Sequence, residues 1–332
     1  MKITVIGAGA IGGLVATYLK EKGCDVRLVA KKEQVDFIQK NGLKIEGVRG
    51  KISVKINADK VMNEPADLVI FAVKTQDIEE VIRQNGEFLK DSIIITTQNG
   101  IRADEIVAKL IHNANIISSI VMFGATYLSV GSIIHNFEGG WIIGRLNGKI
   151  DDKLKEVEQS LSSAFKISVS EHIKGMKWTK LFINLNNCIP AVVGLSMQET
   201  FKEVEMAAIS IQLLKEAFAI VEKCEIKPVS LPEFDIKRYV ALANMPHDEA
   251  AKIFSNIMFN LSREPLYGSI LQSIKRGRVS EIDYINGEFV NLAKKNGISA
   301  PLNEKLTQMV HQVEKTGKFF SKEELIQALV NL

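Results

Sequence analysis

The sequence predicts an α/β domain over residues 1–171 and an all-helical second domain over residues 172–332. Three observations lead to this division. Short β-branched runs alternate with helical stretches up to about residue 170, which is typical of βαβ units around a parallel sheet. The first of these runs ends in a glycine-rich turn. After Lys174 the strand signals almost vanish and helical periodicity takes over.

The bulk composition indicates an ordinary globular protein. The chain has 332 residues, enough for about two domains, with 46% hydrophobic and 24% charged residues. Its net charge of +3 comes from scattered Lys and Arg residues, which argues against a nucleic-acid surface but leaves room for sites that bind small anions. No apolar run reaches the ~18 residues of a membrane span, and no signal peptide is visible.

The three cysteines bear on compartment and metal content. Cys24, Cys188 and Cys224 are odd in number, far apart and without the spacing of metal ligands. Reduced thiols of this kind are typical of a cytoplasmic protein. We therefore expect a cytoplasmic chain with no metal site, no membrane association and no nucleic-acid partner.

The N-terminal strand leads directly into a phosphate-binding pattern. Residues 2–6 are a short β-branched run, residues 7–13 read GAGAIGG, and residues 14–22 form a plausible helix. In this G-x-G-x-x-G pattern Gly7 permits the turn, Gly9 lets the backbone approach a pyrophosphate, and Gly12 lets helix and strand pack closely. The backbone around Ala10 and Ile11 opens the helix, whose N-terminus favours anions. A Rossmann dinucleotide site is predicted; the alternative is a tight turn without a ligand.

The end of the second strand, residues 25–29, bears on which dinucleotide binds. An NAD site usually places an acid there to hold the ribose 2′-hydroxyl. Here Lys31 and Lys32 precede the first carboxylate, Glu33. Two cations suit a 2′-phosphate, so NADPH is favoured over NADH. The alternative is a solvated basic turn, because exposed lysines are common.

Two further buried strands end in polar residues. Residues 66–73 end at Lys74, and residues 92–97 are followed by Gln98 and Asn99. Ligands of open α/β sheets collect at the carboxyl ends of the strands, so we assign Lys74 and Asn99 to the cofactor site. The alternatives are an exposed loop lysine and an ordinary Asn-Gly turn.

The last part of the first domain changes pattern. Strand-like runs at residues 116–123, 131–137 and 141–144 are joined by short turns, which predicts a hairpin extension of the sheet. We interpret His135, a lone strand histidine, as structural. An amphipathic helix at 151–164 and a last strand at 166–170 complete the domain.

Helices dominate the second domain. They are expected at residues 204–223, 247–261, 302–314 and 322–332. Ser321 and Glu324 have the form of a capping box that starts the last one. This helix packs on its own domain or on a partner subunit, so a homodimer is compatible with the sequence but not required by it.

Two segments of this domain contain more polar side chains than the packing of a helical core requires. In residues 178–187, Lys180 and Asn184 are four apart on one helix face, with Asn187 roughly in line at i+7. We expect this face to supply the proton donor of a reductase. In residues 268–287, Ser269 can cap a helix and Glu281 can begin the next after the break at Gly277. The alternative is a pair of capped helices joined by a basic loop.

Taken together, these motifs resemble the ketopantoate reductase (2-dehydropantoate 2-reductase) family, an NADPH-dependent group of the pantothenate pathway. The likeness spans nearly the whole chain. It is carried by GAGAIGG, FAVK at 71–74, QNG at 98–100, Trp178-x-Lys180 with Asn184, Ser269-x-Leu271-Gln272, EIDYING at 281–287, and Gly297-Ile298-x-x-Pro301-x-Asn303. The resemblance implies a Rossmann domain followed by a helical domain of the 6-phosphogluconate-dehydrogenase type.

The resemblance also implies residue roles. Lys180 matches the general acid and Asn184 an amide that holds the substrate. Ser269 matches a residue at the substrate carboxylate, and Glu281 one that binds substrate and helps orient the lysine. Among the cofactor positions it implies are Lys31 for the 2′-phosphate, Lys74 and Asn99.

One position departs from the family pattern. The family commonly has a second substrate-binding asparagine four residues after the first, where this chain has Cys188, with Asn187 just before it. A thiol is a poor substitute for an amide in hydrogen bonding. Either Asn187 shifts in through a local helix distortion, or the substrate is held differently.

The implied reaction is hydride transfer from NADPH to the C2 ketone of 2-dehydropantoate, giving pantoate for coenzyme A synthesis. Lys180 would donate the proton, a contribution of typically ~10²–10⁴-fold. Burial should lower its pKa toward neutrality while a carboxylate such as Glu281 limits the fall. The alternatives are a reductase of another 2-oxo acid and a non-catalytic NADPH-binding regulator on the same fold.

Overall fold

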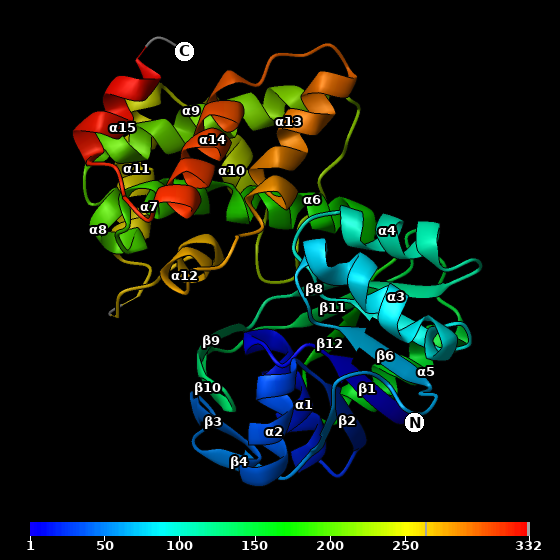
Figure 1. Ribbon diagram of the computed structural model, residues 1–332. Coiled ribbons are helices and arrows are strands. Elements are labelled where there is room, and N and C mark those ends of the chain that lie inside the picture. The colour runs from blue at the N-terminus through cyan, green and yellow to red at the C-terminus, as the bar shows by residue number, and fades with distance from the viewer. Residues whose placement is uncertain (263, 331–332) are drawn as a thin grey trace. The chain divides into compact units, whose positions relative to one another are not determined.

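The computed structural model describes residues 1–262 and 264–330. The chain forms two compact units, Met1–Lys174 and Gly175–Leu332, each with its own secondary structure (Figure 1). The first unit contains the strands and the helices between them, and the second is helical.

An eight-stranded sheet forms the centre of the first unit. Its order is β12-β11-β8-β7-β6-β1-β2-β5. The strands are β1 (Lys2–Ile6), β2 (Asp25–Val29), β5 (Asn57–Asp59), β6 (Leu68–Phe71), β7 (Ile93–Thr96), β8 (Asn115–Val121), β11 (Trp141–Gly144) and β12 (Ile167–Val169). Neighbouring strands are parallel along the run β8-β7-β6-β1-β2-β5 of this order, whereas β11 is antiparallel to β8. Because β2 and β6 lie on opposite sides of β1, the chain reverses its winding direction at β1.

Helices cover both faces of this sheet. On one face lie α1 (Ala10–Glu21), α2 (Lys32–Asn41) and α5 (Asp152–Ser162), and on the other α3 (Ile78–Leu89) and α4 (Arg102–Leu110) (Figure 1). Strand β6 shows why both faces need cover. Its Leu68 and Ile70 join the core under α1, and Val69 and Phe71 join the core under α3. Alternate side chains point to opposite faces, so an all-apolar strand is buried on both.

A second sheet of four strands lies in the same unit, in the order β4-β3-β10-β9. These are β3 (Leu43–Gly47), β4 (Ile52–Val54), β9 (Gly124–Ser129) and β10 (Ser132–Phe137). The predicted hairpin extension is therefore only partly right. Strand β11 extends the main sheet, but the hairpin β9–β10 pairs with β3, far earlier in the chain. Turn residues fix a hairpin locally, whereas the sheet that it joins depends on long-range packing.

His135 of β10 lies in the core between this sheet and α1. Its Nδ1 is 2.8 Å from the hydroxyl of Tyr18, and its ring packs edge-on against Tyr18 and Phe123. Burial lowers the pKa of His135, which keeps the imidazole neutral. This environment suits the structural role expected for it.

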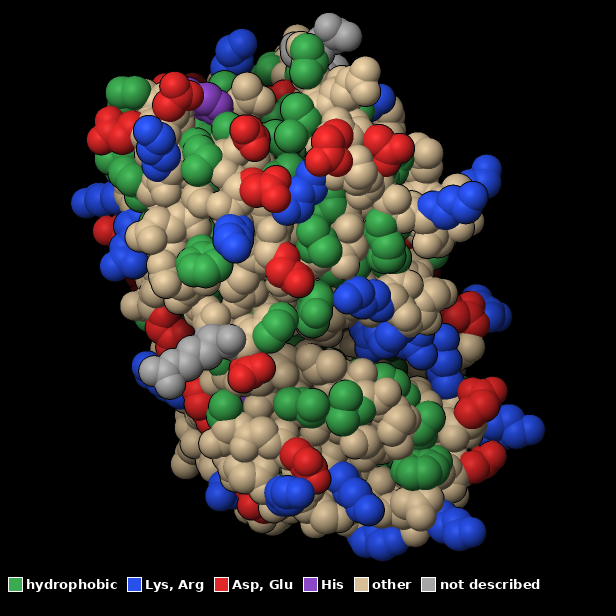
Figure 2. Space-filling view, turned by 90° about the vertical axis from the view of Figure 1, so that its left-hand side faces the viewer, with side chains coloured by type: hydrophobic (Ala, Val, Ile, Leu, Met, Phe, Trp, Pro, Cys, Tyr) green, Lys and Arg blue, Asp and Glu red, His purple; other side chains and the backbone are tan. Residues whose placement is uncertain are grey.

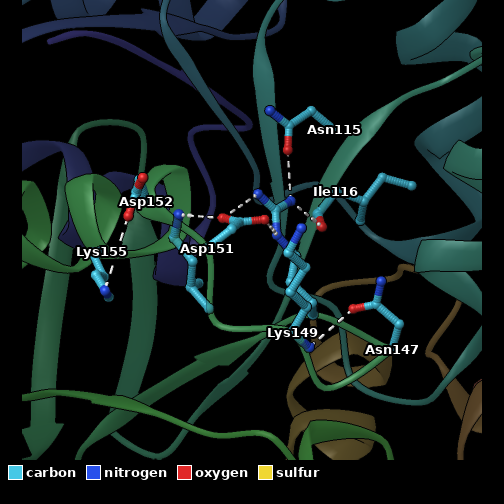
Figure 3. Close-up of polar contacts among 9 residues, drawn as sticks. Asn115, Ile116, Asn147, Lys149, Asp151, Asp152 and Lys155 are labelled. Carbon is cyan, nitrogen blue, oxygen red and sulfur yellow. Dashed lines mark hydrogen bonds and ion pairs between the residues drawn. The ribbon is translucent and has the colours of Figure 1, made fainter.

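An arginine network joins three elements at one edge of the main sheet (Figure 3). Arg145, just after β11, donates to both carboxylate oxygens of Asp151 at 3.1 Å. It also donates to Asn115 Oδ1 at 2.6 Å and to the Ile116 carbonyl at 2.7 Å. Asp151 in turn caps α5 by accepting from the Leu154 amide. The planar guanidinium thus ties β8, β11 and α5 together.

The described part of the second unit consists of helices and loops, with one isolated bridge between Leu231 and Phe234. Its long helix α9 (Val204–Lys223) packs against most of the others. The other helices of this unit are α6 (Ile173–Asn184, beginning in the first unit), α7 (Cys188–Val193), α8 (Met197–Phe201), α10 (Lys237–Asn244), α11 (His247–Phe259), α12 (Ser269–Lys275), α13 (Asn286–Lys295), α14 (Pro301–Thr316) and α15 (Lys322–Leu329). This unit also contains the short 3₁₀ turns η2 (Leu185–Asn187) and η3 (Ile282–Tyr284), whereas η1 (Thr75–Asp77) lies in the first unit.

The predicted capping box is present at the start of α15. Ser321 accepts from the Glu324 amide, and Glu324 accepts from the Ser321 amide at 2.7 Å. The predicted helix continued to residue 332, and residues 331 and 332 lie outside those described.

The surface and the helices of the described residues are those expected from a chain with this proportion of hydrophobic and charged residues. On the face shown in Figure 2, acidic and basic side chains are interspersed over most of the surface, and hydrophobic side chains form small groups. Within the described ranges, no helix combines the length and apolar character needed to span a bilayer.

Candidate functional site

The glycine turn between β1 and α1 is shaped by close backbone contacts. Gly7 has φ of +114°, and a Cβ there would lie 2.7 Å from the carbonyl oxygen of Ala72. Its amide also donates to the Val29 carbonyl at 2.8 Å. A side chain at Gly12 would overlap the carbonyl oxygen of Gly7. Both glycines therefore allow the turn to lie against the ends of β2 and β6.

Gly9 differs from these two glycines because no atom lies within 4 Å of the position of a Cβ. It is the N-cap of α1, in an extended conformation and without a side chain to cap the helix. The first-turn amides of Ala10, Ile11 and Gly12 have no acceptor within the helix. Open space beside free helix N–H groups fits a pyrophosphate, so the turn can accommodate a dinucleotide.

The two lysines after β2 lie at the start of α2. Lys31 is the N-cap of this helix, and both Lys31 and Lys32 are exposed. The same helix is tied to the glycine turn, because Gln34 donates to the Ala8 carbonyl at 3.0 Å and approaches the Tyr127 hydroxyl at 3.3 Å. Sequence reasoning did not single out Gln34, because its partners lie in distant segments.

Lys74 and Asn99 follow the adjacent strands β6 and β7, and both are half-buried. Lys74 is the N-cap of η1. The neighbouring Gln98 is buried and joins the two strand ends, donating to the carbonyls of Phe71 at 2.9 Å and Val73 at 2.8 Å. Gln98 thus holds the loops that carry Lys74 and Asn99. Its signal in the sequence was a polar side chain directly after a buried strand.

Lys180 lies on α6 in the second unit and is half-buried. Burial lowers the pKa of its ammonium to about 8, and the carboxylate of Glu233 opposes this fall. At pH 7 most of the side chain is therefore protonated, yet it can release a proton near neutrality. The structure adds Glu233 as a carboxylate that the sequence pattern did not indicate.

The loop that carries Glu233 is anchored on α6. Thr179 donates its hydroxyl hydrogen to the Val229 carbonyl at 2.7 Å, and the Val229 amide donates to the Gly175 carbonyl at 3.1 Å. Leu231 and Phe234 then exchange two backbone hydrogen bonds of 2.9 and 3.1 Å around Glu233. Each of these bonds involves a main-chain group, so the position of Glu233 is set by the backbone.

The helix breaks immediately after Asn184. Helix α6 ends there, η2 follows as a single 3₁₀ turn, and α7 begins at Cys188. Asn184 is buried, whereas Asn187 is half-buried. A 3₁₀ turn advances the side chains by a larger angle than an α-turn does, so this break is the kind of local distortion that was considered for Asn187.

Cys188 lies on the side of the break that faces the core. It is fully buried, and burial raises the pKa of its thiol to about 12. Its Sγ donates to the Leu185 carbonyl at 3.3 Å and accepts from Asn286 Nδ2 at 3.4 Å. Asn286 also donates to the Leu185 carbonyl at 3.1 Å. Cys188 thus takes part in a buried polar contact between α7 and α13.

Asn187 lies against Gly268, the residue before Ser269, although the two come from distant parts of the chain. A Cβ on Gly268 would be 3.0 Å from Cγ of Asn187, so Asn187 packs against the residue before Ser269. Ser269 is exposed at the first position of α12. Its predicted role as N-cap is wrong, because Gly268 occupies that position with extended backbone angles. The Ser269 hydroxyl is not used to cap the helix.

Glu281 is half-buried and immediately precedes η3, so it begins a short 3₁₀ turn rather than a full helix. The following helix, α13, starts five residues later at Asn286. In the second unit the structure therefore places Lys180 and Asn184 on the same helix, α6, and Asn187 against Gly268 at the start of α12. Among the described residues, no group of three or more His, Cys, Asp or Glu side chains could hold a metal ion.

The doubly wound sheet, the glycine turn at its winding reversal and the helical unit with a half-buried lysine define a two-domain, Rossmann-type oxidoreductase. Residues 3–148 match the family described as ketopantoate reductase PanE/ApbA, and residues 172–314 match its C-terminal domain. The chain belongs to this family of enzymes.

Individual relatives agree with this assignment. The chain is 30% identical over 322 residues to a 2-dehydropantoate 2-reductase of Pyrococcus horikoshii, covering 96% of this chain and 99% of the relative. Among solved structures, a PanE/ApbA family ketopantoate reductase from Ralstonia eutropha superimposes with a TM-score of 0.80 at 24% identity, covering 95% of this chain and 99% of that one. D-Mandelate dehydrogenase with NADH and anilino(oxo)acetate has a similar fold, with a TM-score of 0.81 at 23% identity and the same coverage.

Proposed function

We propose that this protein reduces 2-dehydropantoate to pantoate with NADPH, a step toward pantothenate and coenzyme A. The observation that carries the proposal is Lys180, a half-buried lysine whose pKa is lowered to about 8 on a helix face that also bears Asn184. Relatives that cover nearly the whole chain are named 2-dehydropantoate 2-reductase, which supports the choice of substrate.

A nicotinamide dinucleotide would be held by the first unit. The N–H groups at Ala10, Ile11 and Gly12 would bind its pyrophosphate in the space beside Gly9, and Lys74 and Asn99 would contact it from the ends of β6 and β7. Exposed Lys31 and Lys32 at the start of α2 favour a 2′-phosphate over a free hydroxyl, which supports NADPH. The cofactor supplies a hydride for the C2 ketone when bound.

Lys180 would stabilise the negative charge that develops on the ketone oxygen and donate a proton to that oxygen. With a pKa of about 8 it is mostly protonated at pH 7, and it loses the proton more readily than an exposed lysine does. Asn184 and Asn187 would donate amide hydrogens to the substrate, and Ser269 would bind its carboxylate. Glu281 would bind the substrate and help orient Lys180.

A reductase of a different 2-oxo acid is the second candidate. The observation that favours it is the position of the amides, because Cys188 faces the core and Asn187 is the accessible neighbour. An amide supplied by Asn187 instead of by residue 188 would suit a 2-oxo acid whose shape differs from that of 2-dehydropantoate. A non-catalytic NADPH-binding regulator is less well supported, since such a protein has no need of a lysine with a lowered pKa.

Steady-state oxidation of NADPH with 2-dehydropantoate tests the proposal. NADH is run in parallel, together with a panel of 2-oxo acids that includes phenylglyoxylate and pyruvate. We expect the highest kcat/KM for 2-dehydropantoate and NADPH. Faster turnover of another 2-oxo acid would select the second candidate, and cofactor binding without turnover on any substrate would favour the regulator.

A further inference from the structure

Four polar residues form a bracket around Glu281, the proposed substrate-binding carboxylate. His311 of α14 has Nε2 2.9 Å from Asp283 Oδ1 and Nδ1 3.1 Å from Glu314 Oε2. The other oxygen of Glu314 accepts from the Ser280 amide at 2.7 Å. We call Ser280, Asp283, His311 and Glu314 the Glu281 bracket.

The bracket holds the chain on both sides of Glu281. Ser280, one residue before it, is buried and bound to α14 through Glu314. Asp283, two residues after it, is bound to the same helix through His311. Local hydrogen bonds stiffen the segment further, from the Ile282 amide to Ser280 Oγ at 3.2 Å and from the Tyr284 amide to the Glu281 carbonyl at 3.0 Å.

We propose that His311 is a positioning residue for Glu281, fixing the Ser280–Tyr284 backbone by binding Asp283 and Glu314 at the same time. The inference rests on the proposed function, because it takes Glu281 to be a substrate-binding residue. In this proposal His311 acts only by positioning Glu281 and does not contact the substrate or the cofactor.

The bracket depends on the charge of His311. A neutral imidazole donates one hydrogen bond, whereas an imidazolium donates two. Both ring nitrogens face carboxylates, so the complete bracket requires the imidazolium. Partial burial lowers the pKa of His311, but the hydrogen bonds to Asp283 and Glu314 outweigh it, and the pKa is raised above its usual value.

Charged groups at the start of α14 are engaged elsewhere. Lys294 of α13 pairs with Glu304 at 2.8 Å, two helical turns from His311. Glu216 of α9 binds the amides of Leu302 and Asn303 at the start of α14. Helix α7, which also packs on α14, carries no charged side chain. The charges that act on the imidazole are those of Asp283 and Glu314.

The direction of the pH effect follows from this raised pKa. The stabilisation of the bracket is fully present below the pKa of an unfolded histidine, about 6.5. It is lost as the pH rises through the higher pKa of the folded state. Above that pH the segment that carries Glu281 should loosen, and the KM for the 2-oxo acid should rise.

The test compares wild type with His311→Phe and His311→Gln, and uses His112→Gln, an exposed histidine of the first unit, as the control. In His311→Phe we expect the KM for 2-dehydropantoate to rise roughly tenfold below pH 7, with a smaller fall in kcat because Glu281 also helps to orient Lys180. The Kd of NADPH should stay within about twofold. His311→Gln, whose amide nitrogen can still donate to one of the two carboxylates, should have an intermediate KM and still fold if the phenylalanine variant does not. The control should behave as wild type.

Hydrogen exchange on the same proteins provides a readout that needs no substrate. The Ile282 and Tyr284 amides should lose protection in His311→Phe, and in wild type as the pH rises, after correction for intrinsic exchange. An unchanged KM together with lower stability would reduce His311 to a structural residue and overturn the proposal, as would unchanged protection. Wild type without turnover on 2-dehydropantoate would instead refute the proposed function, and the exchange data would still decide whether His311 fixes this segment.

Discussion

Lys180 shows how the surroundings of a single residue determine its chemistry. An exposed lysine has a pKa near 10.4 and holds its proton too tightly for efficient transfer near neutral pH. Burial lowers the pKa of Lys180 to about 8, and Glu233 prevents a larger fall. Two opposing effects thus keep the side chain protonated at pH 7 but ready to donate.

Removing the lysine should abolish most of the turnover without affecting cofactor binding. In Lys180→Ala we expect kcat for 2-dehydropantoate to fall by ~10²–10⁴-fold, because the proton donor is lost. The Kd of NADPH, measured by fluorescence titration, should stay within about twofold, because the proposed cofactor residues belong to the first unit. Lys174→Ala, an exposed lysine at the start of the same helix, is the control. Near-normal kcat in Lys180→Ala would show that another group donates the proton.

The pH profile of kcat should report the balance between burial and Glu233. In wild type we expect kcat to fall as the pH rises through about 8, because the lysine must be protonated to act. In Glu233→Gln the carboxylate no longer supports the ammonium, so the decline should begin at lower pH. Glu222→Gln, an exposed carboxylate of α9, should leave the profile unchanged. A profile that does not move in Glu233→Gln would exclude this electrostatic role.

At the scale of secondary-structure elements, the break between α6 and α7 rests on a buried polar layer. Asn286 of α13 donates to the Leu185 carbonyl in the break and to Asn303 Oδ1 of α14 at 3.2 Å. Asn303 in turn donates to Glu216 of α9 at 2.9 Å. Four elements therefore meet through one set of hydrogen bonds, and buried polar groups of this kind are costly to leave unpaired.

Truncating Asn286 should destabilise the protein. Asn286→Ala leaves the Leu185 carbonyl with only the weak thiol donor of Cys188 and removes the amide donor to Asn303 Oδ1. We expect the free energy of unfolding to fall by about 1–3 kcal/mol in urea titration. Asn296→Ala is a matched control, because this exposed asparagine at the end of the same helix also donates to a backbone carbonyl. The control should change stability by less than about 0.5 kcal/mol. Equal effects of the two variants would contradict the role of the layer.

Substitutions at two glycines of the first turn should affect stability and cofactor affinity separately. In Gly12→Ala the new methyl group meets the Gly7 carbonyl, so we expect a loss of about 1–3 kcal/mol in stability. In Gly9→Ala nothing lies within 4 Å of the methyl group, so the melting temperature should be nearly unchanged. The same methyl group occupies the space assigned to the pyrophosphate and should raise the Kd of NADPH at least about tenfold. Unchanged NADPH affinity in Gly9→Ala would place the pyrophosphate elsewhere.

At the scale of the whole molecule, the proposed cofactor residues and the proposed acid belong to different units, each with its own buried side chains. The sheet of the first unit presents its loops at the carboxyl ends of parallel strands, where nucleotides bind in such folds. The second unit supplies Lys180, Asn184, Ser269 and Glu281 from segments that are about 100 residues apart in the sequence.

Cofactor choice should be measurable as stability of the whole protein. A ligand at 100 times its Kd stabilises the folded state by about 2.7 kcal/mol. At equal concentrations we expect NADPH to raise the melting temperature more than NADH does, because Lys31 and Lys32 attract the 2′-phosphate. Lys31→Glu should reduce or reverse that difference, with Lys22→Glu, another exposed lysine, as the control. A larger shift with NADH in wild type would overturn the assignment of NADPH.

Much of the fold follows from short-range patterns. The buried strands of the main sheet are β-branched runs with turns at both ends, and the glycine turn, the long helix α9 and the capping box at Ser321 each depend on residues within one or two turns of chain. The partnership of β9 and β10 with β3 escaped prediction, because strand pairing across nearly 90 residues leaves no local signal. Gln34 and Glu233 were missed for the same reason, because each acts on residues that are distant in the sequence. Gln98 did have a local signal, as a polar residue directly after a buried strand, but its partners at the end of β6 did not.

By itself, the sequence determined most of the secondary-structure elements, including the strand, glycine turn and helix at the N-terminus, and the order of the two domains. It also determined which reactive side chains these elements carry, such as a lysine among amides on one helix. Periodicity, capping and backbone sterics act between neighbouring residues, so they can be recognised without the fold. Only the tertiary structure decided that Cys188 faces the core while Asn187 stays accessible, that Glu233 acts on Lys180, and that His311 joins Asp283 to Glu314. Burial and charge interactions depend on distances through space, and folding alone brings those residues together.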